Sequence, residues 1–191
     1  MRDKPYAAGV TIELAPTVAF DPASLERRLF STSSCGVCGR LHLDHLPAPA
    51  KKNDNFRISR ESLYHLPASI SGAQTLFQHT GGLHAAGLFD ASGTLIHLSE
   101  DVGRHNAMDR LIGHALTTDI GLPLDAHVVL FSGRVSYELM QKAVVAGVPV
   151  VAAIGAPSSL AVEIARAYDV TLIGFLRNSR FNVYAGEERV D

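Results

Sequence analysis

Cys35 and Cys38 are the two cysteines of the chain, and they lie in the run from Ser33 to Arg40. Thiolates are strong nucleophiles and metal ligands near neutral pH. Gly36 and Gly39 allow the backbone to turn tightly at little cost, so we expect an exposed loop. Cysteines at this spacing predict redox chemistry, sulfur transfer or metal binding rather than a structural disulfide framework.

A metal is the main alternative for this loop. Cys35, Cys38, His42 and His45 form C-x2-C-x3-H-x2-H, which contains the ligand types of a structural zinc site. The cysteine pair and the histidine pair are closer together than in a finger that folds around its metal. The spacing alone leaves zinc binding and thiol chemistry equally favoured.

The bulk composition is that of an ordinary globular chain. It has 191 residues, 47% hydrophobic and 19% charged, with a formal net charge of -2. This charge gives no general attraction to nucleic acid or to anionic membranes. No apolar run reaches membrane-spanning length, and Met1 to Lys4 are not followed by a signal-peptide core. We therefore expect a cytoplasmic protein with neither nucleic acid nor membrane as a partner.

The pattern becomes regular from residue 80, and strands alternate with helices after residue 94. Apolar strands are expected at 84–89, 94–98, 128–131, 148–154 and 170–176, with helical spacing over 103–117, 135–143 and 160–168. This alternation predicts an α/β layered domain with a mixed, largely parallel sheet flanked by helices. We divide the chain into a strand-helix segment with the cysteine loop (1–46), a linker or mobile loop (47–57) and an α/β cofactor-binding domain (58–191).

Three polar clusters follow predicted strands of this domain. Ligands gather at the carboxyl ends of strands in such sheets, and arginine beside small hydrogen-bonding residues suits a phosphate-bearing ligand. Phe175 and Phe181 flank the third cluster and favour stacking of a base. The candidate residues are Asp101, Arg104, His105 and Asn106; Ser132, Gly133 and Arg134; and Arg177, Asn178, Ser179 and Arg180.

The residues around His84 argue against a zinc deaminase. His84-Ala85-Ala86 has alanine where the His-x-Glu signature needs its carboxylate, and no cysteine follows residue 38. His84 is therefore expected to be a packed, hydrogen-bonded histidine at the end of a strand, and we assign no metal ligands.

Several unusual strings resemble the formate dehydrogenase accessory sulfurtransferase family (FdhD). They occur in order over most of residues 30–186. The strings are SSCGVCG from Ser33, TGGLHAA from Thr80, EDVGRHNA from Glu100, FSGR from Phe131, APSSLA from Ala156, and GFLR from Gly174 running into RFNVY from Arg180.

The resemblance implies a fold similar to cytidine deaminases and a sulfurtransferase activity. Members accept persulfide sulfur from a cysteine desulfurase and pass it to the bis-molybdopterin guanine dinucleotide cofactor, which formate dehydrogenase needs for activity. By the family pattern Cys35 carries the persulfide and Cys38 assists or relays. The resemblance also adds Phe175 and Leu176 to the candidate residues, because the segment from Phe175 to Arg180 matches the one that contacts the molybdenum cofactor in members of the family.

The resemblance leaves one alternative function open, and the chain departs from the family pattern in one respect. The alternative is a non-enzymatic chaperone that holds the molybdenum cofactor while the Cys/His loop is structural or binds zinc. Members usually carry an additional N-terminal region, so we expect this chain to be a short or truncated form. A homodimer and binding of guanine nucleotides as mimics of the cofactor are further expectations.

Overall fold

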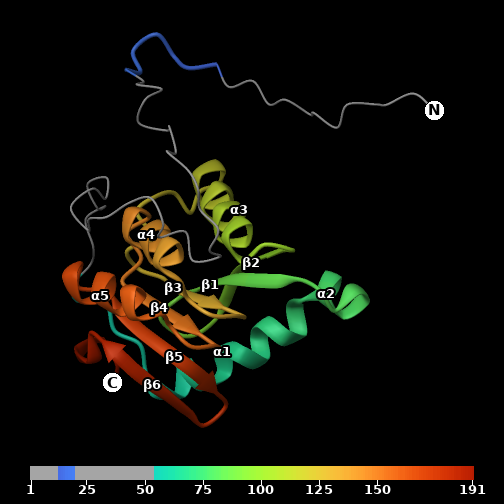
Figure 1. Ribbon diagram of the computed structural model, residues 1–191, viewed down its shortest axis with the longest axis vertical. Helices are drawn as coiled ribbons and strands as arrows, with labels where there is room; N and C mark the ends of the chain where they lie inside the picture. The colour runs from blue at the N-terminus through green and yellow to red at the C-terminus, as the bar shows by residue number, and fades with distance from the viewer. Residues whose placement is uncertain (1–12, 20–53) are drawn as a thin grey trace.

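The computed structural model describes residues 13–19 and 54–191, and the latter form a single six-stranded sheet covered by helices (Figure 1). The elements are α1 (Arg60–Ala73), α2 (Thr75–Thr80), β1 (His84–Phe89), β2 (Leu95–Asp101), α3 (Arg104–Thr117), β3 (Val128–Phe131), α4 (Tyr137–Val145), β4 (Val150–Ala153), α5 (Ser159–Ala167), β5 (Thr171–Arg177), β6 (Arg180–Ala185) and a 3-10 helix (Glu187–Arg189).

The strand order is β2-β1-β3-β4-β5-β6. β3 pairs in parallel with β4, and β4 with β5, whereas β1 is antiparallel to both β2 and β3, and β6 is antiparallel to β5. The α/β architecture with a mixed sheet is therefore confirmed. The parallel part is narrower than predicted, because both outer pairs are hairpins and β1 runs against β3.

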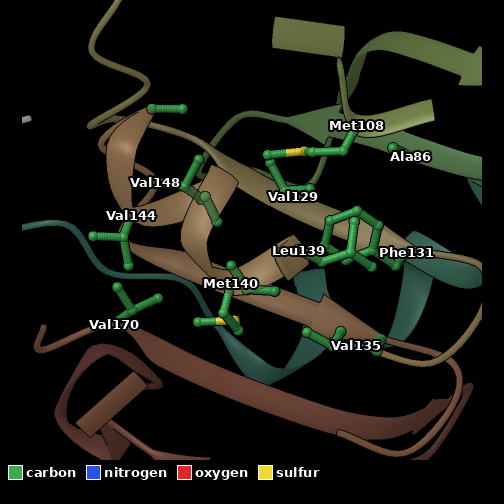
Figure 2. Packing of buried hydrophobic residues seen from close by; sticks show 14 of the residues in the cluster. Ala86, Met108, Val129, Phe131, Val135, Leu139, Met140, Val144, Val148 and Val170 are labelled. Carbon is green, nitrogen blue, oxygen red and sulfur yellow. The ribbon is translucent and has the colours of Figure 1, made fainter. Parts of the chain in front are cut away.

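The central strands are the most apolar ones. Val128 to Phe131 and Val150 to Ala153 are fully buried, as expected for strands covered on both faces. On one face, α3, α4 and α5 enclose a core that includes Met108, Phe131 and Leu139 (Figure 2). On the other face, α1 packs through Leu63, Leu66 and Ile70. The result is three layers, with the sheet in the middle (Figure 1).

The end of the chain is tied to the start of this domain. Ile58 N donates to Arg189 O at 3.0 Å, and Asp191 N donates to Ile58 O at 3.1 Å. Phe56 is only 5% exposed in the core, so the packed domain already includes this residue, which the sequence interpretation placed in the linker. The N-terminal segment and most of the linker lie outside the described residues. No described helix is long and apolar enough to cross a membrane.

Strand directions place the candidate residues at one end of the sheet. β2, β3, β4 and β5 run the same way, because β1 is antiparallel to both of its neighbours. Their last residues are Asp101, Phe131, Ala153 and Arg177. We call this end, together with the loops that follow these strands, the carboxyl edge.

Candidate functional site

All three predicted clusters lie on the carboxyl edge. The first follows β2, the second follows β3, and the third contains the end of β5 and its turn into β6. Neighbouring strands are about 4.8 Å apart, so the four intervals from β2 to β5 span roughly 19 Å. The edge is therefore long enough for an extended ligand rather than a single phosphate.

Asp101 and Asn106 shape the start of α3. Asp101 Oδ1 accepts from Gly103 N and from Asn106 Nδ2, each at 3.0 Å. These hydrogen bonds, first the one from Gly103, lower the pKa of the Asp101 carboxyl below its ordinary value. Arg110, which the sequence interpretation did not single out, lies 3.7 Å from Asp101 Oδ2. Asp101 and Asn106, both predicted, therefore position the backbone at the start of α3 and hold each other in place.

His105 joins two helices at the carboxyl edge. Its Nε2 lies 3.0 Å from Ser136 Oγ and 3.6 Å from Glu138 Oε2, and both partners belong to the start of α4. Burial lowers the pKa of His105, while Glu138 opposes this shift and Arg104 and Lys142 add to it. Ser136 and Glu138 were not predicted, because a contact 31 residues apart in the chain leaves no spacing signal.

The loops after β3, β4 and β5 pack backbone against backbone. Gly155 N donates to Gly133 O at 3.0 Å, and Phe175 N donates to Gly155 O at 3.0 Å. A Cβ on Gly155 would lie 2.9 Å from the carbonyl of Gly133, and a Cβ on Gly174 would lie 2.7 Å from Pro157 Cδ. Glycine at these positions lets the loops close into a continuous edge.

The turn between β5 and β6 combines a strained residue with arginine. Phe175 has a φ of 54°, which side-chain-bearing residues rarely adopt, and its ring is 42% exposed. Arg177 donates from Nη1 to the carbonyl of Ile154 at 2.7 Å, whereas the side chain of Arg180 makes no hydrogen bond or ion pair with another described residue. With Phe181 and Asn182, these residues line an open pocket of about 350 Å³.

Positive electrostatic potential comes from helix ends as well as from arginines. α3, α4 and α5 each begin just after β2, β3 and β4, so their N-termini lie at the carboxyl edge. The N-terminal residues Gly103 and Ser136 make no side-chain cap hydrogen bond to α3 or α4. The first backbone N–H groups of a helix have no acceptor within the helix, and together with the helix dipole they favour anions there. Arg134 is exposed in the same region, and Arg104 has a buried Nε without a hydrogen-bond partner among the described residues.

A larger pocket lies on the α1 side of the carboxyl edge. It has a volume of about 530 Å³, and Ser132, Gly133 and His84 line it from the sheet. Gln74 and Phe77 line it from the helices and were not predicted, because neither belongs to a recognisable motif.

The cysteine loop cannot be placed against these pockets. Cys35, Cys38, His42 and His45 lie outside the described residues, so thiol and zinc chemistry stay predictions there. Within 13–19 and 54–191, no group of three or more His, Cys, Asp or Glu side chains could hold a metal ion.

Comparisons with known proteins identify the family. The family model described as "FdhD/NarQ family" matches residues 6–191. The chain belongs to the FdhD/NarQ family. It is 49% identical over 200 residues to a Streptomyces avermitilis protein named "Sulfur carrier protein FdhD", covering 97% of this chain and 71% of that protein. A Streptomyces coelicolor protein of the same name is 49% identical over 185 residues, covering 95% of this chain and 65% of the relative.

The solved structure of a similar protein supports the fold. The crystal structure of a protein described as a formate dehydrogenase accessory protein, from Desulfotalea psychrophila, matches with a TM-score of 0.67 and 26% identity. The match covers 74% of this chain and 60% of that one. The chain thus spans only part of the length of its FdhD relatives.

Proposed function

We propose that this FdhD/NarQ chain is a sulfur carrier. It takes persulfide sulfur from a cysteine desulfurase and passes it to a bis-molybdopterin guanine dinucleotide cofactor destined for formate dehydrogenase. The observation that carries the proposal is the carboxyl edge, with exposed arginines and two uncapped helix N-termini in a chain whose relatives are named sulfur carriers. A homodimer, contact with formate dehydrogenase and a cytoplasmic location belong to the same proposal.

The first chemical step is a thiol exchange. The Cys35 thiolate attacks the outer sulfur of the desulfurase persulfide, a new S–S bond forms on Cys35, and the desulfurase cysteine leaves as a thiolate. An unperturbed cysteine has a pKa of about 8.5, so a lowered pKa would speed this attack near neutral pH. Arg40 is the nearest cation in sequence that could lower it.

Release of the sulfur requires two electrons. The Cys38 thiolate supplies them by attacking Cys35 Sγ, which forms a Cys35–Cys38 disulfide and expels hydrosulfide as the ligand for the metal of the substrate. A dithiol reductant then restores both thiols. This step gives Cys38 the relay role that the family resemblance implies.

The carboxyl edge provides the cofactor-binding surface in this proposal. A guanine dinucleotide carries several phosphates, which match Arg104, Arg134 and Arg180 and the N-termini of α3 and α4. The exposed ring of Phe175 provides a stacking surface beside Arg180. GDP is therefore a suitable mimic for binding measurements.

Intact-protein mass spectrometry tests sulfur carriage directly. The wild-type chain, incubated with a cysteine desulfurase and cysteine, is expected to gain one sulfur atom. Cys35→Ala should abolish this gain, whereas Cys38→Ala should keep the adduct and slow its release. If the Cys35→Ala variant still restores formate dehydrogenase activity, the chain is a cofactor-binding chaperone and the sulfur-carrier proposal is wrong.

A further inference from the structure

We propose that the pocket between α1, α2 and the carboxyl edge binds a planar nitrogen heterocycle with a hydrogen-bond donor and acceptor side by side on its rim. We call it the Gln74 pocket; its lining includes Gln74, Phe77, Ile70, His84, Ser132 and Ile154. It is separate from the pocket at the β5–β6 turn. The proposal deepens the proposed function, because the guanine and the pterin of the cofactor both have such a rim.

Gln74 is the residue that points to a ligand. It is only 7% exposed, and its side-chain amide makes no hydrogen bond with any other described residue, although the residue lines the pocket. Both amide atoms stay accessible to solvent, because neither is among the buried side-chain atoms that lack a partner, so the amide can pair with a ligand that enters the pocket. The amide presents a donor and an acceptor next to each other, which matches the N–H and C=O of a lactam ring.

The other walls supply what a flat ring needs. Phe77 offers an aromatic face that is 41% exposed, and Ile70 and Ile154 form an apolar wall. The Ser132 hydroxyl accepts from Ala85 N at 2.8 Å and keeps its own O–H for donation into the pocket. The imidazole of His84 makes no hydrogen bond with another described residue and adds a second polar group on the sheet side.

These walls are fixed in position by their surroundings. The carboxylate of Glu100, 9% exposed, accepts from Leu76 N at 3.0 Å and from Phe77 N at 2.9 Å, which holds the start of α2. On the opposite wall, a Cβ on Gly133 would lie 3.3 Å from His84 Nδ1, so glycine gives the imidazole room beside the loop. Binding therefore requires little ordering of the chain.

A fluorescent ring tests the Gln74 pocket. The chain contains no tryptophan, so fluorescence anisotropy of 6-hydroxymethylpterin can be followed as the 191-residue chain is added. We expect saturable binding to the wild type and at least tenfold weaker binding to Gln74→Leu. Gln78→Leu is the matched control, because Gln78 is exposed on α2, and it should bind like the wild type. Equal affinity of a folded Gln74→Leu variant, or no saturable binding to the wild type, would overturn the proposal.

A second variant keeps the test decisive if Gln74→Leu fails to fold. Gln74→Glu has nearly the same shape but presents only acceptors when ionised, so it should show the same loss; wild-type affinity in it would overturn the proposal. Competition against the bound 6-hydroxymethylpterin then shows which ring the pocket prefers. If guanosine displaces it at a lower concentration than a non-fluorescent pterin does, the pocket prefers guanine. If the order is reversed, the pocket prefers pterin.

The outcomes distinguish failure of the pocket proposal from failure of the proposed function. GDP binding that depends on Arg180 but not on Gln74, without pterin binding, overturns the pocket and leaves sulfur carriage standing. Pterin binding that depends on Gln74, with no sulfur adduct on Cys35, supports the pocket and contradicts sulfur carriage.

Discussion

The imidazole Nε2 of His105 lies 3.0 Å from Ser136 Oγ, and this contact joins the first turns of α3 and α4 at the carboxyl edge. Ser136 is the N-cap of α4 but makes no capping hydrogen bond to it, because its hydroxyl faces His105 instead. Glu138 Oε2, 3.6 Å from the same Nε2, is buried and has no hydrogen-bond partner among the described residues. The two helix ends that favour anions are thus held together through one titratable side chain.

Stability should fall when the pH drops below about 6.5. Burial lowers the pKa of His97, His105 and His127 below the ordinary value of 6.5; the His114 ring, stacked 3.6 Å from His97, adds to the shift there. The unfolded chain then binds protons before the folded chain does, so the free energy of unfolding decreases from pH 6.5 down to the folded pKa values and levels off below them. Urea unfolding between pH 5 and 7.5 measures this slope.

His105→Gln isolates the contribution of one histidine. The glutamine amide can still bond to Ser136 but does not titrate, so the slope should become shallower while stability at pH 7.5 changes little. Asp90 and Asp101, whose pKa values are lowered by hydrogen bonds, contribute only below their ordinary value of 3.8 and lie outside this window. An unchanged slope in the His105→Gln variant would contradict the prediction.

Gly155→Ala should destabilise the domain. The added Cβ would lie 2.9 Å from the carbonyl carbon and oxygen of Gly133, which are backbone atoms and cannot rotate away. We expect a loss of about 1–3 kcal/mol in the free energy of unfolding. Gly113→Ala in α3 is the control: its Cβ meets nothing within 4 Å, so it should stabilise by roughly 0.5–1 kcal/mol. Chemical denaturation of both variants distinguishes steric crowding from a general effect of removing glycine.

The two arginines of the β5–β6 turn should behave differently. Arg177 bonds to the carbonyl of Ile154, whereas Arg180 is exposed and unpaired among the described residues. Arg180→Ala should weaken GDP binding roughly tenfold, or about 1.4 kcal/mol, with stability unchanged. Arg177→Ala should weaken GDP binding too, and because it removes the hydrogen bond to Ile154 it should in addition lower the free energy of unfolding by about 1 kcal/mol. Calorimetric titration with GDP and thermal unfolding of each variant test this division; equal losses of stability would contradict it.

Glu100 should be needed for the start of α2. Its carboxylate accepts from two backbone N–H groups, so Glu100→Ala leaves both without their acceptor and should cost about 2 kcal/mol. Glu100→Gln retains one acceptor oxygen and should lose less. Glu61→Ala, an exposed acidic residue in the first turn of α1, is the control and should change stability by less than about 0.5 kcal/mol. Denaturant midpoints rank the three variants, and the order wild type, Glu61→Ala, Glu100→Gln, Glu100→Ala is expected.

Sequence periodicity predicted the elements better than their arrangement. The strand expected at 84–89 is β1, and the apolar run at 128–131 is β3. β2 was expected to end at residue 98 but continues to Asp101, because β1 offers it hydrogen bonds as far as His84. Which strands lie side by side depends on contacts distant in sequence, so the antiparallel placement of β1 against β3 could not be predicted from periodicity.

The candidate site, like the fold, could be predicted only in part from the sequence. Arginines after strands indicated the carboxyl edge, because strand direction alone brings those ends together. Gln74 left no signal, since a lone glutamine at a junction of two helices is ordinary in sequence. The role of Arg177 was also hidden, because its partner is a backbone carbonyl, which any residue at position 154 would provide.

Phe175→Gly should separate stability from binding. The φ of 54° at Phe175 costs a residue with a side chain about 1 kcal/mol or more, and glycine avoids this cost. The ring is 42% exposed, so its removal sacrifices little core packing, and stability should stay equal or rise. GDP binding should weaken roughly tenfold, because base stacking on an aromatic ring is worth about 1–3 kcal/mol. Phe181→Leu is the comparison: Phe181 packs on Tyr64 with ring centroids 5.6 Å apart, so its loss should lower stability as well. If Phe175→Gly lowers stability and leaves GDP affinity unchanged, the left-handed residue is structural and does not serve ligand binding.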